Sequence, residues 1–271
     1  MRPHPHRGLW TLATVAILLV YLLPIGWMIS ASLQPGVTSA SSNLLPRDIA
    51  LDGYLQFFAG EGIRHLQVSL IVALGSVVAT LLIAIPTAYA LSRVRSRFVG
   101  VALVLVLLAQ MIPSVVLANA FYTMFATWGL LNSYLGLIIA NATYGVPFAV
   151  ILLRSFMLRL DSEVLEAAQL DGLGPLSVLV RIVLPLSRNA IVTAGVFAFL
   201  FAWGDLLFGL TLTTRTEMYP MTIFIYALSN TPTSAWAAVM AASLLTSIPA
   251  LVVVLGAQQY IKAGLVLGSG R

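Results

Sequence analysis

The chain is organised around the stretch Leu165-Glu166-Ala167-Ala168-Gln169-Leu170-Asp171-Gly172, which is followed by Arg181-Ile182-Val183-Leu184-Pro185. This stretch is polar where its flanks are apolar, and it lies in the longest segment between two hydrophobic runs. Asp161 or Ser162 can cap a short helix here, with a carboxylate in the first turn. Gly172 ends that helix, because glycine tolerates a positive φ just past a helix end. The sequence therefore predicts a short helix with a small-residue face at a membrane surface, open to close approach by another protein.

The composition indicates a membrane protein. The 271 residues are 60% hydrophobic and 8% charged, with a mean hydropathy of +0.99, whereas an ordinary soluble domain has about 25% charged residues. Apolar runs of roughly twenty residues suit α-helices that cross a bilayer. The predicted fold class is an all-α polytopic membrane protein with six transmembrane helices in a single domain, residues 1–271, with a cytoplasmic loop at 154–188. The expected spans are about 10–29, 66–91, 99–118, 134–153, 189–212 and 235–255.

The distribution of basic residues gives the orientation, because cytoplasmic loops carry an excess of lysine and arginine. One side of the predicted topology holds eleven of the fourteen basic residues, and the other side holds three. The basic side carries both termini and the loop 154–188, so all three are expected in the cytoplasm. A cleaved signal peptide is the alternative for the first apolar run. That run is long for a signal peptide, which favours a retained first span.

The complete pattern in the central loop is specific: Glu166-Ala167-Ala168, Asp171-Gly172, nine residues, then Ile182-x-Leu184-Pro185. It lies between the fourth and fifth predicted spans and resembles the EAA loop of ABC importer permeases; the alternative is an ordinary interfacial helix. The resemblance implies a type I ABC importer permease fold whose coupling helix docks in a groove of an ATP-hydrolysing subunit. The residues that it assigns to ATPase coupling are Glu166, Ala167, Ala168, Asp171, Gly172, Ile182, Leu184 and Pro185.

Further motifs extend the resemblance over most of the chain, to the second permease of maltose-type carbohydrate importers. Val68 stands where that family usually has Asn, and the ending Val266-Leu267-Gly268 also departs from it. The implied partners are a second permease subunit, an ABC ATPase dimer, an extracytoplasmic solute-binding protein and a sugar substrate, in the lipid of a bacterial plasma (inner) membrane. The matching motifs are Val68-Ser69-Leu70, Ala88-Tyr89-Ala90 with Arg93, Gln110-Met111-Ile112-Pro113, Gly129 to Leu137, and Gln258-x-Tyr260-Ile261-x-x-Gly264-Leu265.

Several side chains at membrane depth are candidates for the substrate pathway. A lone polar group in hydrocarbon is penalised, so such side chains face a cavity or bond a neighbouring helix. Asp205 alone among the nine carboxylates falls inside a predicted span; it would line the path, reach an outer vestibule, or lock two subunits together. Sugar importer permeases often read Trp-Asn-Glu or Trp-Asn-Asp where this chain has Trp203-Gly204-Asp205. The candidates are Gln110, Asn119, Tyr122, Asn141, Tyr144, Trp203 and Asp205.

The sequence predicts no catalytic or metal site. It contains no cysteine, and its three histidines lie outside the expected spans. It has no Walker A loop, so ATP and Mg²⁺ are expected in the partner ATPase, and this chain binds no cofactor. The net charge of +5 follows the membrane topology, so no nucleic-acid partner is expected. Two rival functions stay open: an ion-coupled secondary transporter and a non-transporting membrane scaffold subunit.

Overall fold

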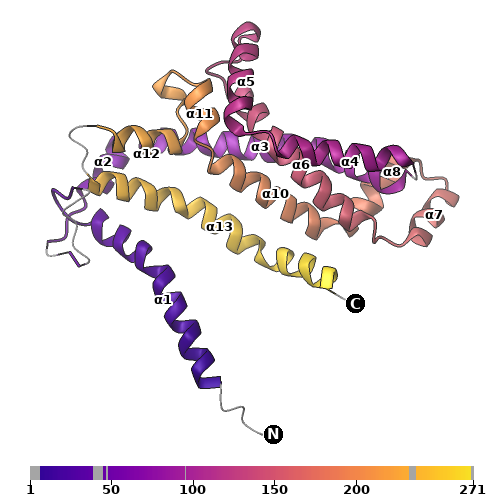
Figure 1. Ribbon diagram of the computed structural model, residues 1–271, viewed down its shortest axis with the longest axis horizontal. Helices are drawn as coiled ribbons and strands as arrows, with labels where there is room; N and C mark the ends of the chain where they lie inside the picture. The colour runs from indigo at the N-terminus through magenta and orange to yellow at the C-terminus, as the bar shows by residue number, and fades with distance from the viewer. Residues whose placement is uncertain (1–6, 39–44, 47, 95, 232–235, 270–271) are drawn as a thin grey trace. The chain divides into compact units, whose positions relative to one another are not determined.

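The computed structural model describes residues 7–38, 45–46, 48–94, 96–231 and 236–269. Over these residues the chain is helical, without strands, so the predicted all-α class is confirmed. Figure 1 shows the order of the elements along the chain. The α-helices are α1 (Arg7–Ser32), α2 (Asp52–Ala59), α3 (Gly62–Arg93), α4 (Arg97–Gln110), α5 (Ser114–Trp128), α6 (Tyr134–Met157), α7 (Ser162–Leu170), α8 (Pro175–Val178), α9 (Leu184–Leu186), α10 (Arg188–Trp203), α11 (Leu207–Leu212), α12 (Met221–Ser229) and α13 (Trp236–Ser269). A π-helix η1 (Leu179–Val183) and a 3₁₀ turn η2 (Thr216–Met218) complete the set.

Among the described residues, four helices are long and apolar enough to cross a membrane: α1, α3, α6 and α13. Two bent pairs pass the same test together. These are α4 with α5, which meet at 91°, and residues 175–186 with α10, which meet at 82°. The structure therefore has up to six spans if each bent pair counts as one.

The expected third span, residues 99–118, is not one straight helix. It ends at Gln110 and restarts at Ser114. Pro113 has no N–H to continue the ladder of hydrogen bonds, and its ring disfavours helical geometry at the residue before it. An apolar run of the right length is therefore divided into two helices that point in different directions.

The expected fifth span, residues 189–212, is also interrupted, because α10 ends at Trp203. The carboxylate of Asp205 accepts hydrogen bonds from the N–H groups of Phe208 at 3.2 Å and Gly209 at 3.1 Å. A short acidic side chain that binds these amides favours the start of a new helix. The new helix, α11, packs against α5 and α6.

The chain forms two compact units. The first takes in described residues up to Ile63 and the segment Phe224–Ile248; the second consists of Arg64–Ile223 and continues from Pro249. Every residue singled out above for coupling or for the substrate pathway belongs to the second unit. The core of this unit supports both groups of residues.

Small residues let α3 and α6 approach closely in the second unit. A Cβ added at Gly145 would collide with the side chain of Thr80, and one added at Gly75 would collide with Ile138. Thr80 and Ala84 of α3 are fully buried and lie four residues apart, on one face of the helix. Membrane helices commonly pack through small residues in this way. Lipid tails are as apolar as the helix surface, so the hydrophobic effect does not bring helices together and close van der Waals packing does.

Candidate functional site

The predicted coupling helix is α7. It begins where the Asp161 Oδ1 accepts the N–H of Glu163 at 3.0 Å. It ends in a Schellman motif: the Gly172 N–H donates to the Gln169 carbonyl at 3.0 Å, and the Leu173 N–H donates to the Ala168 carbonyl at 3.1 Å. Gly172 has a φ of +84°, the left-handed conformation that this motif requires. The start and the end of α7 therefore follow from two local side-chain choices.

One face of α7 is buried in its own chain. Leu165 and Ala168 are 4% and 6% exposed and join an apolar cluster with Leu153 and Met157 of α6. Ala167 is exposed, so the two alanines that the sequence predicts as one small face differ in surroundings: they point about 100° apart around the helix, one outward and one toward the bundle. Only Ala167 is open to another protein, whereas Ala168 attaches α7 to the bundle.

The other face of α7 is open. Glu166, Asp171 and Gly172 are exposed, as are two leucines outside the predicted set. Leu170 is 89% exposed and Leu176, in α8, is 73% exposed. Leucines recur through this segment, at 165, 170, 173, 176 and 179, so no local signal in the sequence separates the exposed ones from the buried ones.

The motif Ile182-x-Leu184-Pro185 lies where the segment returns to the bundle. The Leu184 N–H donates to the carbonyl of Leu179, five residues back, which is the π-helical pattern. Ile182 and Leu184 are half-buried against the same apolar cluster as α7, and Pro185 is exposed. The first two residues therefore attach the coupling segment, and the chain bends by 82° before α10 begins.

A groove of about 740 Å³ lies beside α7, with Arg93, Arg154, Glu166 and Gln169 in its lining. Two hydrogen bonds connect the C-terminal ends of α3 and α6 next to this groove. The Arg93 Nη2 donates to the carbonyl oxygen of Met157 at 2.9 Å, and the Arg154 Nε donates to the carbonyl oxygen of Leu91 at 3.0 Å. The sequence reasoning gave these arginines no role in the site, although a cation in the last turn of a helix is a signal for such contacts.

Four of the seven predicted pathway residues belong to the region of α4, α5 and α6, and two of them, Gln110 and Tyr144, adjoin the break between α4 and α5. Gln110 ends α4, and Asn119 and Tyr122 lie three residues apart on α5; all three are exposed. Tyr144 of α6 donates its hydroxyl to the carbonyl of Ile112 within the break, at 3.4 Å. These side chains combine hydroxyl and amide groups with an interrupted stretch of backbone.

The other three predicted pathway residues have partners within the bundle. Asn141 is 6% exposed and donates from Nδ2 to the carbonyl of Leu137 in its own helix, at 2.9 Å. Trp203 is buried and stacks on Phe199, with ring centroids 5.2 Å apart. Asp205 caps α11, as described above. The Asn141 hydrogen bond and the Trp203 stacking lie within their own helices, and Trp203 also packs in an apolar cluster with Ala73 of α3.

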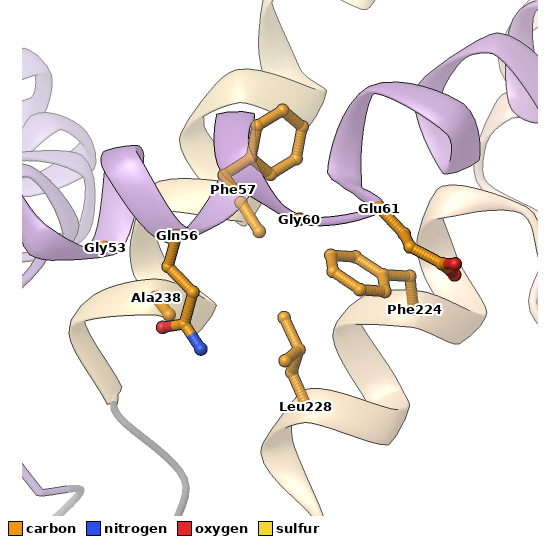
Figure 2. A pocket seen from close by; sticks show the side chains of 9 residues that line it. Gly53, Gln56, Phe57, Gly60, Glu61, Phe224, Leu228 and Ala238 are labelled. Carbon is orange, nitrogen blue, oxygen red and sulfur yellow. The ribbon is translucent and has the colours of Figure 1, made fainter.

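A smaller cavity of about 210 Å³ lies in the first unit, among α2, α12 and α13. Figure 2 shows the side chains of Phe57, Phe224 and Leu228 around it. None of the seven pathway candidates, all of which the structure describes, lines this cavity.

Comparison with known proteins gives the relatives of this chain. Residues 80–266 match the family described as binding-protein-dependent transport system inner membrane component. The chain is 33% identical over 266 residues to a probable ABC transporter permease protein, y4oR, of Sinorhizobium fredii, covering 96% of this chain and 94% of that protein. It is 29% identical over 265 residues to the trehalose transport system permease protein SugB of Mycobacterium tuberculosis, covering 96% of each.

A solved structure has a similar fold. It is described as a crystal structure of a bacterial ABC transporter involved in the import of the acidic polysaccharide alginate. One of its chains superposes with a TM-score of 0.78 at 22% identity, over 96% of this chain and 99% of that chain. The predicted importer permease fold is thereby confirmed. The chain belongs to the family of binding-protein-dependent transport system inner membrane components.

Proposed function

We propose that this permease subunit forms half of the translocation pathway of an ATP-driven sugar importer and couples to its ATPase through residues 154–188. The observation that carries the coupling role is α7 itself. It is capped at both ends, buried on one side in its own bundle, and open on the other side. A helix of this kind, outside the spans, can take up force from a partner and pass it to the core behind it. The trehalose permease relative supports a carbohydrate substrate.

The open side of the segment has the features of a protein-binding surface. Leu170 and Leu176 expose most of their surface outside the predicted spans, where the solvent is water. Burying one leucine on docking contributes about 1.5–3 kcal/mol. Glu166 and Asp171 lie nearby in the chain, and charged groups at the rim of an interface fix its orientation. We infer that the two leucines are the apolar anchors of the ATPase contact.

The proposed assembly contains a second permease subunit, an ABC ATPase dimer and an extracytoplasmic binding protein. ATP and Mg²⁺ bind to the ATPase, and this chain is not itself catalytic. The basic residues described at the ends of α3 and α6 and in the coupling segment support a cytoplasmic location for this side of the protein. The termini are proposed to be cytoplasmic as well, although residues 1–6 and 270–271 fall outside the described part of the chain.

The break between α4 and α5 is the proposed place of sugar contact. Irregular backbone at membrane depth is tolerated where it faces protein or a water-filled cavity. Gln110 and Tyr144 offer an amide and a hydroxyl at the break. Asn119 and Tyr122 offer the same groups further along α5, and all of these match the hydroxyls of an uncharged sugar. Asn141, Trp203 and Asp205 are proposed to stabilise the helices that form the pathway without contacting the sugar.

The test is ATP hydrolysis by the complex that co-purifies with this chain, reconstituted in lipid vesicles. Binding proteins loaded with trehalose, maltose or longer glucose oligomers are added in turn, and hydrolysis and uptake are measured together. The expected result is stimulation by one loaded binding protein. Uptake driven by an ion gradient without ATP would indicate the secondary transporter, and absence of uptake under both conditions would indicate the scaffold subunit.

The anchoring role of Leu170 has a sharper test. Leu170→Ala is expected to reduce retention of the ATPase subunit on the purified permease by about tenfold, because most of one buried leucine is lost. Leu55→Ala is the matched control. Leu55 is 63% exposed on α2, between the first two expected spans, and the cytoplasmic N-terminus predicted above puts this connection on the side away from the ATPase. Equal retention by both variants contradicts the proposed surface.

A further inference from the structure

Two arginines tie the ends of α3 and α6 together in a reciprocal pair. Arg93 is the last residue of α3 and donates to the carbonyl of Met157, the last residue of α6. Arg154, in the last turn of α6, donates to the carbonyl of Leu91, in the last turn of α3. The last four carbonyls of a helix have no partner within it, and the negative end of the helix dipole lies there. Each helix therefore supplies an arginine that donates to a free carbonyl at the C-terminal end of the other helix.

This pair lies between the coupling helix and the bundle. Met157, whose carbonyl accepts the Arg93 hydrogen bond, has a fully buried side chain in the apolar cluster that contains Leu165 and Ala168 of α7. Arg93 and Arg154 also line the groove beside α7. Only residues 158–161 separate α6 from α7 along the chain. Side-chain packing thus joins α7 to Met157, and the arginine contacts join the end of α6 to α3.

The geometry of Arg93 is costly to maintain. Its Nε is buried, and among the described residues it has no hydrogen-bond acceptor. A buried donor without an acceptor is destabilising, and such groups in native structures call for an explanation. A cation that served only the orientation of the protein in the membrane would gain by turning toward water. Arg93 instead directs its Nη2 to the neighbouring helix end, with its guanidinium over the ring of Tyr89 at 6.0 Å.

We propose that Arg93 and Arg154 are positioning residues of the transport cycle. They make the ends of α3 and α6 move together with α7, so that displacement of the coupling helix reorients both helices and does not merely bend the link at 158–161. The inference rests on the proposed function, since it presupposes that α7 receives movement from an ATPase. It assigns a coupling role to two residues outside the EAA motif.

The test uses the complete complex in vesicles and measures sugar uptake per ATP hydrolysed, with the sugar that stimulates the wild-type complex best. Arg93→Gln and Arg154→Gln remove the directed charge. Each is expected to lower uptake per ATP by about tenfold, the factor that corresponds to one charge-assisted hydrogen bond. Uptake per ATP in the double variant is expected to equal that of the single variant with the lower uptake, because the two contacts act as one unit. Arg154→Lys keeps the charge and is expected to recover part of the loss.

Arg159→Gln is the matched control. Arg159 follows α6 by two residues, is exposed, and lies over the ring of Phe156 at 5.5 Å. It carries the same charge at the same end of the same helix, so its loss should leave uptake per ATP unchanged. An equal effect of Arg159→Gln and Arg154→Gln would mean that only the number of cations matters, and would overturn the proposal.

A second measurement separates positioning from folding. The chain has no cysteine, so a pair of spin labels can be placed at Ala90→Cys and Val164→Cys, both exposed, on α3 and α7. We expect a narrow distance distribution in the wild-type background and a broadened one with Arg154→Gln or, where that variant does not assemble, with Arg154→Lys. An unchanged distribution, or a parallel loss of hydrolysis and uptake with the amount of complex, overturns the positioning role. A wild-type complex that does not couple hydrolysis to uptake contradicts the proposed function instead, before any variant is compared.

Discussion

Gly172 gives the most direct test of the coupling helix, because the chain provides its own control two residues away. Gly172 has a φ of +84°, and no atom lies within 4 Å of the position that a Cβ would occupy. Gly172→Ala therefore meets no steric clash, and its cost is that of the left-handed backbone alone, about 1–2 kcal/mol. Gly174 is equally open, with a φ of −68°, so Gly174→Ala carries no such cost.

The cost falls on two hydrogen bonds. The N–H groups of Gly172 and Leu173 close the end of α7, and Leu173 packs against the apolar cluster beneath it. A penalty of 1–2 kcal/mol shifts the balance between the closed and the frayed helix end by a factor of about 5–30. Gly172→Asn should lose least, since asparagine tolerates the left-handed region. Gly172→Val should lose most and abolish transport, because a β-branched residue is a genuine outlier at positive φ.

The assay is binding-protein-stimulated uptake per ATP hydrolysed in vesicles, with the amount of inserted permease and of bound ATPase measured in parallel. Membrane insertion should be the same for all variants, because Gly172 lies outside every expected span. Uptake should fall in the order Gly174→Ala, Gly172→Asn, Gly172→Ala, Gly172→Val. Wild-type uptake by Gly172→Val, with full assembly, would refute the reasoning, because the conformation of the helix end would then be irrelevant to coupling.

Two further predictions concern the bundle. Asp205→Ala should lower the stability of the permease by about 1–2 kcal/mol through loss of the α11 cap, measured by thermal unfolding of the complex; an unchanged stability with an altered apparent affinity for sugar would show that Asp205 contacts the substrate. Gly145→Ala should destabilise the α3–α6 contact by about 1–3 kcal/mol, because its Cβ collides with the Thr80 side chain. Thr80→Ala in the same chain should restore much of this loss, and a double variant no better than Gly145→Ala would contradict the packing explanation.

The bounds of α7 could be predicted from sequence because their causes are local. A carboxylate at Asp161 and a glycine at Gly172 act on backbone groups two to four residues away, whatever lies around them. The role of each face could not be predicted in the same way. Whether Ala167 or Ala168 faces outward depends on where the end of α6 lies, and that is a property of the folded bundle.

The interruptions of the spans show a similar division. Five prolines fall inside the expected spans, at positions 24, 86, 113, 147 and 249, and proline disfavours a straight helix at each of them. In the structure Pro24, Pro86, Pro147 and Pro249 stay inside continuous helices, whereas Pro113 separates two. A contact from another helix accompanies this break: the hydroxyl of Tyr144, thirty-two residues away in the sequence, donates to the Ile112 carbonyl at 3.4 Å. Length and hydropathy register none of this.

The distribution of rigid and interrupted elements in the second unit bears on how coupling would work. Three sets of contacts hold the coupling segment and the adjacent helix ends to the bundle. They are the buried face of α7, the arginine hydrogen bonds between α3 and α6, and the packing of the half-buried Ile182 and Leu184. Two helix interruptions lie further along the bundle, at residues 111–113 and 204–206, and a third, the 82° bend before α10, lies in the coupling segment itself. A bundle that is tightly packed at the coupling segment and has helix breaks further away can convert a displacement of α7 into a change of angle at those breaks. Under the proposed function, variants in the contacts of the coupling segment should therefore lower uptake per ATP. Variants at the break near Tyr144 should change the selection or affinity of the sugar and leave uptake per ATP unchanged.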